Sequence, residues 1–150
     1  MRLVIQRVKN ASVRIDGALK SAIGQGLLIL VGIGEDDTED DISWLIKKVI
    51  ALRIFDDENG VMNKCVTDID GEILVVSQFT LMASYKKGNR PSYIRAARPE
   101  TAIPLYKRFC DALSEAFGKT VGEGEFGADM KVELLNDGPV TICMDTKNKE

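Results

Sequence analysis

The chain has 150 residues, a formal net charge of −3, and 45% hydrophobic and 29% charged residues. This size and composition are typical of one globular domain, which we expect to span residues 1–150. The chain has no histidine, and its three cysteines, Cys65, Cys110 and Cys143, form no metal-binding spacing. We therefore expect no metal site, and any hydrolysis must proceed without the imidazole that usually serves as general base.

The start of the chain does not resemble a targeting segment. Met1 to Arg7 interrupts its apolar residues with charge, and the longest nearly apolar stretch, Gly26 to Gly34, is too short to cross a bilayer. We expect a cytoplasmic protein with reduced thiols and no membrane association.

Strand patterns fill the first 33 residues. Apolar positions in residues 3–15 predict a strand, Asp16-Gly17 predicts a hairpin turn, and residues 19–23 fit a return strand. Residues 27–33 are a continuous apolar run, which is typical of a strand buried on both faces.

Two helices are predicted. The first follows the acidic segment Glu35 to Asp41, where Thr38 and Asp41 fit a capping box. Six acids in seven positions also suggest a metal site, but capping and the helix dipole account for most of them. Pro99 fits the first turn of the second helix, and Gly118 fits its end.

The order of elements predicts one α/β domain. Two helices should pack on a mostly antiparallel sheet or partly closed barrel. The segment Gly122 to Gly127 matches the G-x-G-x-x-G pattern of dinucleotide-binding proteins. It carries little weight, because it does not lead from a strand into a helix.

The residues after the predicted strand Ile73 to Val76 are candidates for chemistry. Ser77, Gln78, Phe79 and Thr80 could aim backbone N–H groups and hydroxyls at a carbonyl oxygen that becomes negative. On spacing alone, a strand that continues with Phe79 packed inward is the simpler interpretation. Thr80 has no neighbouring base and is a poor nucleophile.

Gly138-Pro139 is the second candidate segment. On sequence alone it predicts a turn between two strands. A cis peptide bond there would let both carbonyls project toward a ligand, as a rigid pair of acceptors that could read the shape around a chiral carbon.

A basic segment lies between Ser84 and Arg108. It carries seven basic residues and one acid in an otherwise acidic chain. Such a segment suits a local phosphate contact, and a solvated loop and helix face explains it equally well.

Four segments together resemble the D-aminoacyl-tRNA deacylases, also called the D-tyrosyl-tRNA deacylase family. They are Ser77-Gln78-Phe79-Thr80-Leu81, Lys87-Gly88-Asn89-Arg90-Pro91-Ser92, Phe126-Gly127-Ala128-Asp129-Met130 and Asn136-Asp137-Gly138-Pro139-Val140-Thr141. They occur in the order and register of that family, and the first 15 residues resemble it as well, so the similarity covers essentially the whole chain.

The resemblance implies a three-layer β/β/α fold and a cytoplasmic homodimer with its active site at the subunit interface. The implied reaction is hydrolysis of the ester that joins a D-amino acid, or glycine, to the 3′ end of tRNA. It also implies chiral proofreading in translation by steric rejection of L-amino acids, with no metal or organic cofactor.

Roles for single residues follow from the same resemblance. Gly138 and Pro139 would form a Gly-cisPro motif that enters the partner subunit's pocket and rejects L-amino acids. Ser77, Gln78, Phe79 and Thr80 would be the catalytic segment, assisted by the 2′-hydroxyl of the terminal ribose. Substrate-binding and tRNA-binding residues complete the expected site. Phe126, Ala128 and Met130 would bind the substrate, with Met130 near the adenosine, and Lys86, Lys87 and Arg90 would contact the tRNA.

Two other classes of function fit parts of the same sequence. One is a module that binds the 3′ end of RNA without cutting it, and the other is a structural homo-oligomer with Gly138-Pro139 as an interface turn.

Overall fold

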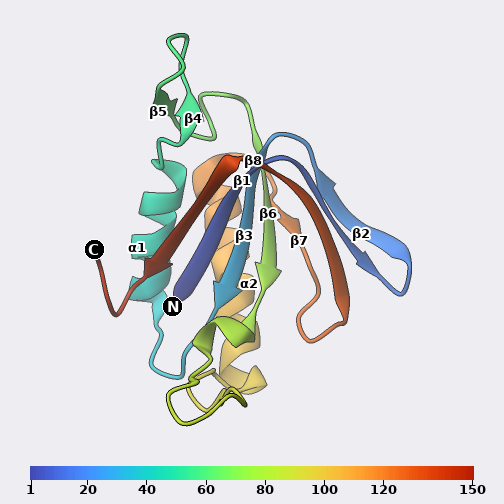
Figure 1. Cartoon of the computed structure of the whole chain (residues 1–150), viewed down its shortest axis with the longest axis vertical. Helices are drawn as coiled ribbons and strands as arrows, with labels where there is room; N and C mark the ends of the chain where they lie inside the picture. Colours follow the sequence, from blue (N-terminus) through green and yellow to red (C-terminus); the bar gives the residue numbers. More distant parts are fainter.

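The computed structural model describes residues 1–150, which form a curled sheet with two helices against it (Figure 1). The strands are β1 (Arg2–Ile15), β2 (Ala18–Ile23), β3 (Gly26–Gly32), β4 (Phe55–Asp56), β5 (Met62–Lys64), β6 (Glu72–Ser77), β7 (Gly122–Glu123) and β8 (Met130–Asp145). The helices are α1 (Glu39–Ile50), the short 3₁₀ helix η1 (Phe79–Met82) and α2 (Pro99–Phe117). The β4–β5 hairpin forms a separate small sheet that projects from one end of the molecule (Figure 1).

Strand β1 organises the main sheet. It pairs antiparallel with β3 through residues 2–8, with β2 through residues 11–15, and with β8 along nearly its whole length. Because β1 pairs with β3 along its first half and with β2 along its second half, the sheet curls and is nearly closed like a barrel, as predicted. Strands β3 and β6 are parallel, and the segment that contains α1 supplies the crossover that such a pair requires.

Two apolar cores explain the continuous apolar runs of β3 and β6. Leu27 and Ile29 face the helices, whereas Leu28 between them faces the other half of the curled sheet. Strand β6 alternates in the same way, with Val75 toward the helices and Leu74 toward the sheet. These strands are therefore buried on both faces, and the layers are sheet, sheet and helix, as expected for a β/β/α fold.

The helix boundaries agree with the predicted signals. Asp41 Oδ2 accepts a hydrogen bond from the Thr38 N–H at 2.8 Å, which completes the capping box of α1. Helix α2 has Pro99 in its first turn and ends at Gly118, whose φ of 76° is left-handed. Neither helix combines the length and the apolar character that crossing a membrane would need.

The acidic segment before α1 connects distant parts of the chain. Asp37 is buried, accepts the Gly34 N–H at 2.7 Å and pairs with the α-ammonium group of Met1. Glu35 accepts the N–H of Arg98 at 2.7 Å, which helps to fix the start of α2. These carboxylates are therefore engaged in capping and cross-linking.

The capping residue Asp41 should make stability depend on acid. Burial by itself would raise the pKa of Asp41, but hydrogen bonds from Thr146, Thr38 and Lys147 outweigh it and hold the pKa well below its usual range. Since the pKa is depressed in the folded state, Asp41 stabilises the fold above its unfolded pKa. This contribution is lost as the pH falls below about 4.

We therefore expect Asp41→Asn to lower the free energy of unfolding at pH 7 by about 1 kcal/mol. It should also flatten the decline in stability between about pH 4 and pH 2, measured by urea unfolding. Asp40→Asn is the matched control, because Asp40 is exposed in the same first turn. Equal effects of the two substitutions would contradict this role of Asp41.

Candidate active site

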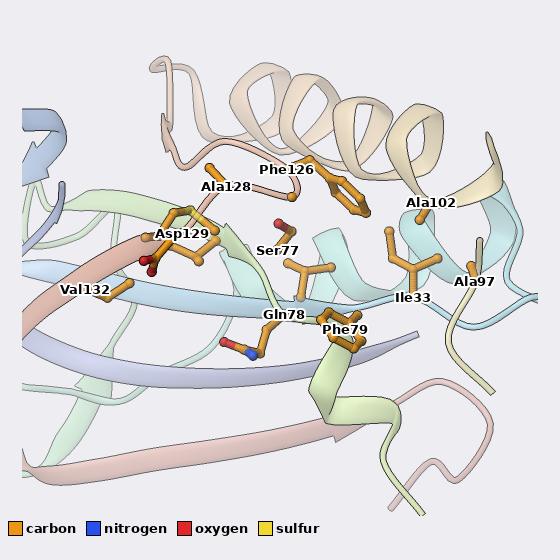
Figure 2. Close-up of a pocket in the computed structure, with 14 residues that line it drawn as sticks. Ile33, Ser77, Gln78, Phe79, Ala97, Ala102, Phe126, Ala128, Asp129 and Val132 are labelled. Atoms are coloured by element: carbon orange, nitrogen blue, oxygen red, sulfur yellow. The ribbon is translucent and has the colours of Figure 1, made fainter. Parts of the chain in front are cut away.

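A cavity of about 280 Å³ opens at the carboxyl end of β6 (Figure 2). Strand β6 and η1 form one wall, the loop before β8 forms another, and the start of α2 closes a third side. The lining residues are mostly apolar: Val31, Ile33, Val76, Ser77, Gln78, Phe79, Ala97, Ala102, Phe126, Gly127, Ala128, Asp129, Met130 and Val132. The sequence predicted six of these as site residues, and the structure brings those six to one cavity.

The backbone changes direction at the end of β6 and leaves two N–H groups without partners. Ser77 is still paired with Val31 of β3, and the Gln78 N–H donates to the Val31 carbonyl at 2.7 Å. Phe79 and Thr80 then begin η1, and no acceptor in the chain receives either of their N–H groups. Two adjacent donors are thus held by the sheet and remain available to a ligand.

The side chains of this turn point in different directions. The Ser77 hydroxyl points toward the loop that carries Phe126, whereas Gln78 points to the other side of β6 (Figure 2). The Gln78 amide Nε2 donates to the Thr80 hydroxyl. Thr80 itself does not line this cavity but a separate hollow of about 640 Å³.

The facing wall is the loop between β7 and β8. Phe126 and Ala128 lie across the cavity from Ser77 in Figure 2, and Met130 also lines the cavity. The Gly124 N–H donates to the carbonyl of Val75 at 2.9 Å, which attaches this loop to β6. The three residues Phe126, Ala128 and Met130, predicted to bind substrate, therefore line the same cavity as the predicted catalytic segment.

The cavity contains no evident general base. Asp129 is its one ionisable lining residue, and the Asp129 side chain is 80% exposed and pairs with Lys131 at 2.9 Å. The groups whose pKa is strongly raised, Tyr106 and Cys110, owe this first to burial and lie outside the cavity. The other polar groups at the cavity are the Ser77 and Gln78 side chains and the backbone dipoles at the end of β6.

Gly138 and Pro139 are joined by a cis peptide bond and are exposed. Gly138 has a φ of 137°, and a Cβ atom there would lie 2.8 Å from the Val140 side chain, so the position requires glycine. Arg7 fixes this segment, since its Nε donates to the carbonyl of Asp137 at 2.9 Å and its Nη1 donates to the carbonyl of Ile54 at 2.7 Å.

The Gly138-Pro139 segment does not reach the cavity of its own chain. It lies opposite Arg7, because Gln6 pairs with Thr141 and Val8 pairs with Asn136. The cavity lies beside Val31, which pairs with Leu3, four positions along β1 from Arg7. At the rise of a β-strand, four positions correspond to about 13 Å.

The basic loop lies next to the cavity. Lys86, Lys87 and Arg90 are exposed, and none of them forms a salt bridge. Tyr93 of the same loop packs edge-on against Phe79, with ring centroids 5.0 Å apart. The loop is thereby connected to the wall of the cavity.

Sequence reasoning missed several residues of the site. Ile33, Ala97, Ala102 and Val132 line the cavity through apolar side chains that carry no chemical signal in a sequence. Arg7 was also missed, because its part in fixing Gly138 depends on a hydrogen bond between residues 130 positions apart.

Comparison with known proteins defines the family. The sequence profile described as "D-Tyr-tRNA(Tyr) deacylase" matches residues 4–145, so the chain belongs to this family. A D-aminoacyl-tRNA deacylase of Bacteroides thetaiotaomicron is 70% identical over 150 residues, the full length of both chains.

Two solved structures support the same fold. One is called c-Myc DNA Unwinding Element Binding Protein. It has a TM-score of 0.93 and 41% identity, and the match covers 97% of this chain and 99% of that one. The other, described as a probable eukaryotic D-amino acid tRNA deacylase, has a TM-score of 0.84, and the match covers 95% and 97% of the two chains. Its identity of 16% supports the fold alone.

Proposed function

We propose that this chain hydrolyses the ester bond between a D-amino acid and the terminal adenosine of tRNA. The observation that carries the proposal is the pair of unpartnered N–H groups of Phe79, which lines an apolar cavity, and of Thr80, the next residue, in a chain of the deacylase family. Charged tRNA is used in translation, so the protein would act in the cytoplasm as a proofreading enzyme.

The two N–H groups supply electrostatic stabilisation. As water adds to the ester carbon, the carbonyl oxygen becomes negative and accepts hydrogen bonds from Phe79 and Thr80. The ester C–O bond then breaks, the amino acid leaves as a carboxylate, and the 3′-oxygen of tRNA takes up a proton. One such donor typically contributes about 2.7–4 kcal/mol to barrier lowering.

The substrate itself supplies the proton-transfer group in this mechanism. The cavity offers no histidine and one exposed carboxylate that is already paired with a lysine. The 2′-hydroxyl of the terminal ribose is adjacent to the ester and can assist the transfer without any protein base. Phe126, Ala128 and Met130 would hold the adenosine on the opposite wall.

Chiral selection requires a second protomer. Gly138 and Pro139 are exposed and distant from their own cavity, while Arg7 holds them in a fixed conformation. In a homodimer with its active sites at the subunit interface, each Gly-cisPro segment would enter the partner's cavity and leave no room for an L side chain. Glycine has no side chain to exclude, so glycyl-tRNA is expected to be a substrate as well.

The direct test compares D-tyrosyl-tRNA, L-tyrosyl-tRNA and glycyl-tRNA as substrates, corrected for spontaneous hydrolysis without enzyme. We expect kcat/KM to be at least about 100-fold higher for the D ester than for the L ester. The side chain of an L-amino acid would collide with the Gly-cisPro segment, and rotation about its single bonds would not relieve the collision. The glycyl ester should be cut as well. Equal rates for the D and L esters would refute chiral selection, and binding of all three without cleavage would indicate an RNA-end binding module.

A substrate ending in 2′-deoxyadenosine tests the assisting group. We expect its kcat to fall by about 100-fold or more, the usual size of a lost acid–base contribution. Single-turnover hydrolysis of D-tyrosyl esters on ribose-ended and deoxyribose-ended tRNA would measure it. Unchanged cleavage of the deoxy substrate, together with complete inactivity of Thr80→Ala, would instead identify the Thr80 hydroxyl as a nucleophile.

The basic loop is proposed to contact tRNA phosphates through Lys86, Lys87 and Arg90. Lys86→Gln with Lys87→Gln should raise KM for D-tyrosyl-tRNA and reduce the slope of log KM against log salt by roughly 0.7 per lost contact. Hydrolysis of D-tyrosyl-adenosine, which lacks these phosphates, should not change. Lys20→Gln with Lys47→Gln removes two exposed cations elsewhere, and an equal effect of that control would contradict a specific role for the loop.

A further inference from the structure

Tyr106 of α2 contacts two walls of the cavity, strand β6 and the loop between β7 and β8. Its hydroxyl donates to the carbonyl of Val75 at 3.0 Å, two residues before Ser77. Its ring packs against Phe126, with centroids 6.2 Å apart and planes at 55°. Tyr106 is 5% exposed and does not line the cavity, so its contacts are with the walls rather than with a ligand.

The same carbonyl of Val75 also accepts a hydrogen bond from the backbone of the loop between β7 and β8. The Gly124 N–H donates to it at 2.9 Å, so one acceptor holds both the helix and the loop. Gly124 also approaches Met130 so closely that a Cβ atom would lie 2.6 Å from the thioether sulfur. The loop segment from Gly124 to Phe126 therefore packs against Met130 at Gly124 and against Tyr106 at Phe126.

The Tyr106 hydroxyl keeps its proton under all ordinary conditions. Burial raises the pKa of this group far above that of free tyrosine, and the neighbouring Cys110 raises it further. The hydroxyl consequently remains a donor to Val75 across the pH range in which the enzyme would work. Lys107, the next residue on α2, also pairs with Glu123 of β7 at 3.6 Å, which adds a second attachment at the edge of the loop.

We propose that Tyr106 is a positioning residue that sets the wall formed by Phe126 and Met130 at the distance from Ser77 that the terminal adenosine requires. This inference rests on the proposed deacylase function. Tyr106 acts through Phe126 and through the shared Val75 carbonyl, and it touches neither the ester nor the attacking water. Its loss should therefore weaken adenosine binding and leave the chemical step nearly intact.

The experiment compares Tyr106→Phe with Leu45→Val. Tyr106→Phe keeps the ring and removes the hydroxyl. Leu45→Val trims a fully buried side chain on α1, in the same core but away from the cavity. We expect Tyr106→Phe to raise KM for D-tyrosyl-tRNA about fivefold, the fold-change that corresponds to one neutral hydrogen bond. Its kcat should stay within about twofold, and it should weaken binding of non-hydrolysable 3′-(D-tyrosyl)amino-3′-deoxyadenosine by the same factor as KM.

The control separates positioning from general stability. Leu45→Val should lower the thermal midpoint without changing KM, because it removes packing from the core alone. Hydrogen exchange at the Gly124 amide should become faster in Tyr106→Phe and not in Leu45→Val, and this measurement needs no substrate. An unchanged KM with unchanged exchange in Tyr106→Phe would overturn the inference, as would an equal rise of KM in Leu45→Val.

The outcomes also distinguish this inference from the function on which it rests. Wild-type protein that cuts no D-tyrosyl-tRNA would refute the proposed function. In that case faster exchange at Gly124 in Tyr106→Phe would still support the role of Tyr106 in holding the loop between β7 and β8, and unchanged exchange would refute that role.

Discussion

Backbone pairing along both edges of β1 is the constraint on which the rest of the molecule depends. One edge meets β8 along nearly its whole length, and the other meets β3 and then β2. A strand in this position has few free N–H or C=O groups, so its partners cannot slide without breaking many hydrogen bonds. The pairing therefore fixes β3, and through β3 it fixes β6, whose last residue begins the proposed active site.

The proposed active site uses fixed dipoles instead of an ionisable catalytic group. The Gln78 N–H donates a hydrogen bond to the Val31 carbonyl of β3. This bond holds the next two N–H groups, those of Phe79 and Thr80, in place at the end of β6. Donors held in this way need no reorganisation when charge develops on a substrate oxygen, which is the main advantage of a preorganised site. A chain without histidine can perform hydrolysis in this manner when the substrate carries its own hydroxyl next to the ester.

The same pairing separates the two functional segments within one chain. Gly138-Pro139 is held opposite Arg7, four positions along β1 from the level of the cavity. In the two-fold symmetric dimer that we propose, the segment and the cavity both lie on the interface patch, so the segment of each chain would enter the cavity of the other. In that arrangement selection by shape and stabilisation of the reacting oxygen would come from different protomers.

The sequence by itself determined the elements and much of the residue content of the site. Period and capping signals located α1 and α2, and the apolar runs of β3 and β6 indicated burial on both faces. Such features are local, because they depend on neighbouring residues and on the preferences of the backbone. The family motifs contributed Ser77 to Thr80 and Phe126 to Met130, and the cavity is lined by three residues of the first segment and all five of the second.

Only the tertiary structure decided how these segments meet. The parallel pairing of β3 with β6, the attachment of Tyr106 to Val75 and the distance of Gly138 from its own cavity all join residues far apart in the chain. Apolar wall residues such as Ala97 and Ala102 look like any other core residue until the fold places them beside a cavity. Contacts of this kind depend on the packing of whole elements, and no local pattern records them.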